Sequence, residues 1–271
     1  MSNRNVMARD WVHSVVSRHL PATARRYSLA VYVGEKSVNA TIGIRIDLHP
    51  AEGKVVELTD EWVLLKVGRG AEFFVAARDL VDAVPALGAV VRITPYARRG
   101  FDGRRLDAPT EQITDSGLRL QSWTLGESRS RLPIDKESLK SQYLRDMIDQ
   151  VETLDAGDGV RSMSQVLVDA GAWMHPVEFV DPHDRDIIAT PPALKFRVAT
   201  AKHVGGFEIR YDRAADTYNL FLTGQDGGIV KECEGALFDD IAGITVDWVD
   251  DGSWRIAKVE VLKPALRSKA A

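Results

Sequence analysis

The chain has 271 residues, with 35 lysines and arginines against 39 aspartates and glutamates, and a net charge of −4 at pH 7. A chain of this length more often folds as two domains than as one. The mild negative charge excludes a protein that coats nucleic acid by bulk charge, but it does not exclude a local basic patch.

Cysteine content and hydropathy indicate the cellular compartment. Cys233 is the only cysteine, so no intramolecular disulfide can form, as is usual in a reducing cytoplasm. The sequence has no apolar run long enough to cross a bilayer, and its N-terminus lacks the apolar core of a signal peptide. We therefore expect a cytoplasmic protein without a membrane partner.

Residues 1–36 are expected to form a helix and a strand. Apolar residues at helical spacing precede Pro21, and residues 27–33 have the composition of a strand. Five arginines make the first 26 residues positive. The segment is therefore either a basic arm or a short helix that packs Trp11 onto the next domain, and the second interpretation is favoured.

Residues 37–126 are expected to form a small closed β-barrel of SH3-like or OB-like size. Short runs rich in β-branched and aromatic residues alternate here with turn residues, as in a β-meander. A sheet this short exposes long edges unless it closes on itself. The expected strands cover residues 38–48, 54–58, 62–67, 73–75, 89–94 and 118–123.

Residues 127–271 are expected to form an α+β domain, because the apolar period changes from two to 3.6 near Leu132. Helices over residues 135–154 and 162–171 predict an αα-hairpin. Short strands follow, then a helix over residues 237–249 and a closing strand over residues 254–262. The pattern predicts an antiparallel sheet with helices on one face.

The strongest local motif is the basic hairpin at residues 96–105, in which four arginines and two aromatic residues surround a glycine-rich turn. Guanidinium groups can bind phosphates while aromatic rings stack on bases. The alternative is a solvated hairpin tip whose arginines pair with the protein's own acids, with Phe101 in the barrel core. The candidate nucleic-acid-binding residues are Arg69, Tyr96, Arg98, Arg99, Phe101, Arg104 and Arg105.

Other motifs are weaker indicators of a functional site. His175, His183 and nearby aspartates could bind a metal, but they have no helical ligand spacing, and loop composition explains them better. Acidic residues over 239–251 are expected to be a solvated face and a turn. The chain contains no Walker A, G-x-S-x-G or H-E-x-x-H motif. We therefore expect neither enzymatic activity, nor a cofactor, nor a metal.

Part of the barrel segment resembles the small β-domain of KfrB-like accessory proteins of conjugative plasmids and integrative elements. The similar residues are Gly53–Val56, Trp62–Gly70 and Val84–Gly88. The resemblance implies an accessory role in a mobile genetic element and supplies no catalytic residues.

These observations predict a non-enzymatic nucleic-acid-binding accessory protein of a mobile genetic element, with single-stranded nucleic acid as its partner. The alternative is a protein-interaction module that inhibits a host defence complex or another protein partner through the acidic surface of the second domain.

Overall fold

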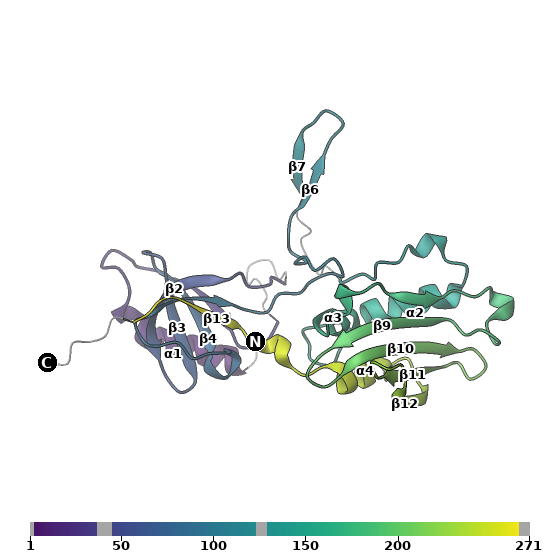
Figure 1. The fold of residues 1–271 in the computed structure, drawn as a ribbon. Helices are drawn as coiled ribbons and strands as arrows, with labels where there is room; N and C mark the ends of the chain where they lie inside the picture. The colour runs from purple at the N-terminus through teal and green to yellow at the C-terminus, as the bar shows by residue number, and fades with distance from the viewer. Residues whose placement is uncertain (1–2, 37–44, 123–128, 266–271) are drawn as a thin grey trace. The chain divides into compact units, whose positions relative to one another are not determined.

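A computed structural model of the chain describes residues 3–36, 45–122 and 129–265 (Figure 1). The chain divides into two compact units. Unit 1 comprises Met1–Ala97 and Gly252–Ala271, and unit 2 comprises Arg98–Asp251. This grouping differs from the expected division at residues 36 and 126, because the C-terminal segment belongs with the N-terminal one. Unit 2 is therefore inserted within unit 1 along the chain.

Unit 1 contains a six-stranded sheet with the strand order β1-β4-β3-β2-β5-β13. β1 runs parallel to β4, and the other neighbours are antiparallel. Its elements are α1 (Asn3–Val15), η1 (Val16–Arg18), β1 (Ser28–Tyr32), β2 (Ala51–Leu58), β3 (Trp62–Val67), β4 (Glu72–Ala77), η2 (Arg78–Leu80), β5 (Val90–Thr94), η6 (Ser253–Arg255) and β13 (Lys258–Lys263).

Helix α1 packs against this sheet. Ala8 and Val12 are completely buried, and the Trp11 ring stacks on Trp62 with centroids 6.4 Å apart. The structure therefore supports the packed-helix interpretation of the N-terminal segment.

The expected closed barrel is wrong. The sheet ends at β1 and at β13, and no ladder joins these two strands among the described residues. The first expected barrel strand lies mostly within residues 37–44, outside the described part, and residues 46–48 form no strand. The edges are protected in another way. The C-terminal strand covers β5 and carries Lys258, Glu260 and Lys263, charges that discourage further strand pairing.

Unit 2 is built on a five-stranded antiparallel sheet with the order β12-β11-β10-β9-β8. Its elements are β6 (Thr110–Ile113), β7 (Arg119–Ser122), η3 (Lys136–Ser138), α2 (Gln142–Thr153), α3 (Met163–Asp169), η4 (Ala172–Met174), β8 (Glu178–Val180), η5 (Asp184–Asp186), β9 (Ala193–Ala199), β10 (Val204–Asp212), β11 (Thr217–Thr223), β12 (Ile229–Ala236) and α4 (Ile241–Val249).

The sheet of unit 2 has one buried and one solvated face. Alternate residues of β9, β10 and β11 are buried, as the period of two requires. The buried face packs against α2, α3 and α4, and Phe207 meets Trp248 edge-on at 6.4 Å. The α+β architecture of this unit thus has its helices on one face of the sheet.

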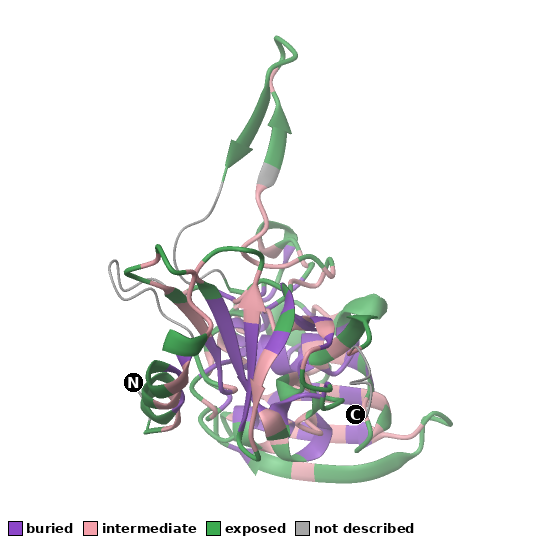
Figure 2. Cartoon of the chain, turned by 90° about the vertical axis from the view of Figure 1, so that its left-hand side faces the viewer, coloured by how far each residue is buried: buried purple, intermediate pink, exposed green. Residues whose placement is uncertain are grey.

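Strands β6 and β7 form a separate hairpin, almost entirely exposed over its described length (Figure 2). β7 occupies most of the segment expected to be the last barrel strand, but it pairs only with β6. In the described part of the chain, no helix is long and apolar enough to cross a membrane.

Candidate nucleic-acid interface

The basic hairpin forms a tight loop that is fixed by backbone hydrogen bonds. The Gly100 N–H donates to the Arg104 carbonyl at 2.9 Å, and the Leu106 N–H donates to the Arg98 carbonyl at 3.0 Å. The buried Gln165 side chain donates to the Arg99 carbonyl at 2.7 Å. This bond holds the loop against α3, so the backbone of the loop is positioned before any ligand arrives.

The four arginines of the loop have different surroundings. Arg98 is buried, and Arg105 donates twice to the Asp107 carboxylate, at 2.7 and 2.8 Å. Arg99 and Arg104 are exposed. Arg99 donates to the Gly103 carbonyl, and among the described residues no carboxylate lies within ion-pairing distance of either guanidinium. Only Arg99 and Arg104 are therefore available for phosphates.

The two aromatic candidates contact the protein itself. Tyr96 belongs to unit 1, where its ring meets Trp254 edge-on with centroids 4.7 Å apart. Phe101 packs against the core of unit 2, with its ring 6.5 Å from that of Phe196. Arg69 is exposed in the turn between β3 and β4 of unit 1. The candidate residues are thus divided between two units and do not form a single surface within either one.

Replacing Phe101 with alanine is expected to lower the free energy of unfolding of unit 2 by about 2–3 kcal/mol, somewhat less than for a fully buried phenylalanine. The reason is lost packing against the core around Phe196. Phe101→Leu retains most of that volume and should cost less than about 1.5 kcal/mol. Urea denaturation measures both values. A loss below about 0.5 kcal/mol for the alanine variant would contradict the packing role.

An exposed tryptophan beside the loop was missed by the sequence reasoning. Trp173 lies in η4, and 40% of its surface is exposed. Its ring covers Gly103 so closely that a Cβ at position 103 would lie 2.7 Å from the Trp173 Cζ3 atom. The indole therefore adjoins the loop that carries Arg99 and Arg104. The available signal was an aromatic residue two positions after Gly171, where the second expected helix ends.

Comparisons with protein-family models, with curated proteins and with solved structures give no match for this chain.

The metal-ligand candidates are not brought together. In the described residues, no group of three or more His, Cys, Asp or Glu side chains is placed to hold a metal ion. Asp181 instead accepts hydrogen bonds from the backbone N–H groups of Lys140 and Ser141. Asp181 therefore fixes the start of α2.

The acidic residues near the end of α4 are also structural. Asp250 pairs with Arg161, and Asp251 accepts a hydrogen bond from the Ala201 N–H at 2.8 Å. The expected solvated turn is thus a connection between α4, α3 and β9.

Proposed function

We propose that this chain is a non-enzymatic, nucleic-acid-binding accessory protein of a mobile genetic element, and that unit 2 holds a single strand through Trp173, Arg99 and Arg104. One observation carries the proposal: an exposed indole ring lies beside a fixed loop that presents two arginines without a carboxylate partner. Indole faces stack on bases, and guanidinium groups bind phosphates.

The surface favours binding without sequence discrimination. Stacking on an aromatic ring tolerates any base, because every base has a π-face. Phosphate contacts orient the strand but carry no sequence information. The mobile-element context rests on the resemblance of the Gly53–Val56, Trp62–Gly70 and Val84–Gly88 segments to KfrB-like proteins.

Replacing both arginines, in Arg99→Ser/Arg104→Ser, is expected to weaken single-strand binding equally for all sequences and to flatten its salt dependence. Two phosphate contacts on a single strand give a log–log salt slope of about −1.4, and the double variant should lose this slope. Trp173→Ala should weaken binding by about 1–3 kcal/mol, whereas Trp173→Phe retains a stacking face. Fluorescence anisotropy with labelled oligonucleotides at several salt concentrations measures these changes.

Arg185 provides a matched control, because its side chain is 81% exposed and its partner in unit 2 is Asp186. Arg185→Ser should bind as the parent does. Absence of binding by the parent protein at low salt would refute the proposed function. Binding that is unchanged in Trp173→Ala and in the double arginine variant would assign it to another surface.

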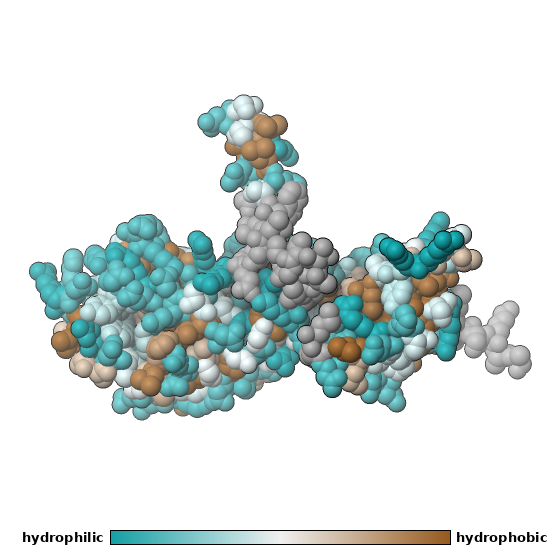
Figure 3. Space-filling view, turned by 180° about the vertical axis from the view of Figure 1, so that it is seen from behind, coloured by the Kyte–Doolittle hydropathy of each residue, from teal (hydrophilic) through white to brown (hydrophobic). Residues whose placement is uncertain are grey.

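A protein-interaction module is the second candidate function. The β6–β7 hairpin exposes Ile113, Leu118 and Leu120, with exposures of 70%, 59% and 45%. Figure 3 shows hydrophobic surface on this hairpin. Exposed apolar groups on a projecting element are typical of protein-binding surfaces. This candidate replaces the first if nucleic-acid binding fails at low salt while a stable protein partner is found.

A further inference from the structure

The solvated face of the unit 2 sheet carries one cation that differs from its neighbours. Glu208 forms ion pairs with Lys195 at 3.6 Å and with Arg210 at 2.7 Å. Arg197 points from the same face, two residues beyond Lys195 on β9. Among the described residues, Arg197 has no hydrogen-bond or ion-pair partner for its side chain. The sheet therefore leaves one guanidinium uncompensated.

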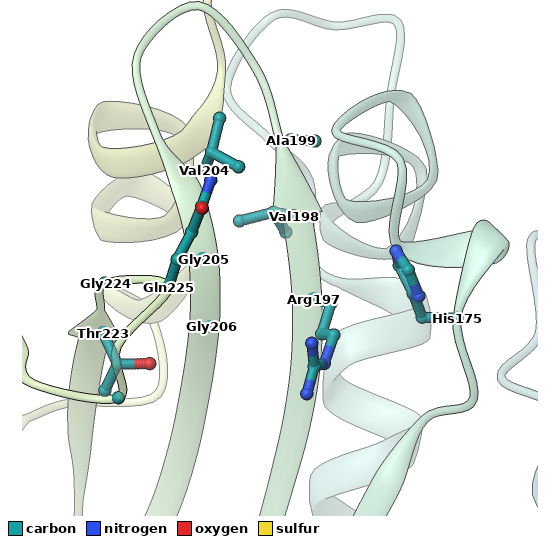
Figure 4. A pocket seen from close by; sticks show the side chains of 11 residues that line it. His175, Arg197, Val198, Ala199, Val204, Gly205, Gly206, Thr223, Gly224 and Gln225 are labelled. Carbon is teal, nitrogen blue, oxygen red and sulfur yellow. The ribbon is translucent and has the colours of Figure 1, made fainter.

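A hollow lies beside Arg197 because the neighbouring position has no side chain. Arg197 pairs with Gly206 across the β9–β10 ladder, and Gly206 pairs with Thr223 across the β10–β11 ladder. A Cβ at position 206 would lie 2.4 Å from the Thr223 Oγ1 atom. Figure 4 shows the result, with Thr223 on one side of Gly206 and Arg197 with His175 on the other.

The hollow has the chemistry of an anion site. Its volume is about 460 Å³, and its lining includes Arg197, His175, Thr223 and Gln225 but no carboxylate. Among the described residues, the hydroxyl of Thr223 and the imidazole of His175 have no hydrogen-bond partner. Val204, which is 47% exposed, adds an apolar wall. A guanidinium beside hydroxyl and amide donors is suited to a phosphate, and the volume of the hollow is in the range of small-ligand sites.

We propose that this hollow binds a phosphate monoester, with Arg197 and the Thr223 hydroxyl donating to the phosphate oxygens and Val204 contacting the organic part. Two sources share this chemistry: a free nucleotide, and the 5′-phosphate at the end of a nucleic-acid strand. The hollow shares no residue with the surface around Trp173, so phosphate binding here does not depend on strand binding there.

The test is to titrate the full chain with adenosine 5′-monophosphate, with inorganic phosphate and with adenosine, and to monitor binding by NMR. The monophosphate should bind, phosphate should compete with it, and adenosine should bind at least tenfold more weakly. Arg197→Gln should weaken monophosphate binding at least tenfold, and Thr223→Val about threefold. Lys195→Gln is the matched control on the same strand and face, and it should change the affinity less than twofold.

A competition experiment distinguishes the sources. If strand ends are the ligand, an oligonucleotide with a 5′-phosphate should displace adenosine 5′-monophosphate from the parent protein. The same oligonucleotide without the 5′-phosphate should not displace it. If neither displaces it, the ligand is a free nucleotide. No binding of the monophosphate at millimolar concentration, equal binding of adenosine, or unchanged affinity in a folded Arg197→Gln variant would overturn the proposal. Loss of strand binding in Trp173→Ala leaves these outcomes unaffected.

Discussion

Replacing Arg161 with methionine is expected to lower the free energy of unfolding of unit 2 by about 3–5 kcal/mol, the range found when one partner of a buried ion pair is removed. The Arg161 side chain is only 1% exposed and pairs with Asp158 at 2.8 Å, with Asp169 at 3.1 Å and with Asp250. One guanidinium thus connects the loop after α2, the end of α3 and the residue that ends α4. Methionine fills similar space but leaves three half-buried carboxylates without this cation.

The control for this prediction is Arg210→Met, which removes a partly exposed arginine paired with Glu208 on the same unit. A loss of no more than about 1 kcal/mol is expected there, as for most surface ion pairs. Adding Asp158→Asn, Asp169→Asn and Asp250→Asn to Arg161→Met should recover part of the lost stability, because the uncompensated charges are then gone. Urea denaturation measures all variants. A loss below about 1 kcal/mol for Arg161→Met would contradict the role assigned to the cluster.

The pKa shifts within the cluster give the expected pH dependence. Burial raises the pKa of Asp158, but the hydrogen bonds and charge of Arg161 outweigh burial, so the pKa lies below its ordinary value. Burial lowers the pKa of Arg161, and its three carboxylates outweigh this and raise it. A carboxyl with a lowered pKa stabilises the fold above its unfolded pKa of about 3.9 and ceases to do so as pH falls. The stability difference between parent and Arg161→Met should therefore narrow below about pH 4.

Much of the local structure could be predicted from the sequence, because it depends on neighbouring residues. β3 spans Trp62–Val67 as expected. The two helices expected over residues 135–171 appear as α2 and α3. In these cases the apolar period and the turn residues are sufficient, since each element is determined by its own side chains.

The sheet partners could not be predicted in the same way. β13 has the composition of an ordinary strand, and no feature of its residues indicates that it pairs with β5, more than 160 positions earlier. The parallel pairing of β1 with β4 also joins segments that are distant in sequence, such as Ser28 and Glu72. The barrel prediction assumed that exposed sheet edges are protected only by closure of the sheet. In unit 1, β1 pairs with β4 and β13 pairs with β5 instead.

The candidate site shows the same division between local and long-range information. The hairpin at residues 98–105 was recognisable, because glycine and arginine define it locally. Arg105 pairs with Asp107 and Arg98 is buried, so neither arginine is available to a ligand. Trp173 joins the loop only through the fold, by packing on Gly103. Composition alone identifies a basic loop, but the fold determines which side chains can meet a ligand.

A chain that ends after Asp251 is expected to lose the folding of unit 1 while unit 2 still unfolds cooperatively. Truncation removes β13, which pairs with β5 through five residue pairs. With one hydrogen bond for each pair, worth about 0.5–1.5 kcal/mol, the loss is about 2.5–7.5 kcal/mol. Truncation also removes the bonds between Ala257 and the backbone of Leu80 and Asp82. A loss of this size is comparable to the whole stability of a typical domain.

Truncation also removes the acceptor of a side-chain hydrogen bond in unit 1. The Tyr32 hydroxyl donates to the Arg255 carbonyl at 2.6 Å, and burial raises the pKa of Tyr32 to about 12, so this donor stays protonated at every ordinary pH. Truncation leaves the buried hydroxyl without this acceptor. The matched control ends after Ala265 and keeps β13 intact, so it should unfold as the full chain does.

Differential scanning calorimetry and hydrogen exchange distinguish the outcomes for the truncated chain. Rapid exchange confined to residues 3–97, with protection retained over α2, α3 and β9–β11, is the expected result. A separately expressed piece covering residues 98–251 should then unfold at the same temperature as unit 2 in the full chain. Full protection of β2 to β5 in the truncated chain would show that these strands fold without β13, and that the unit 1 sheet does not need its C-terminal strand.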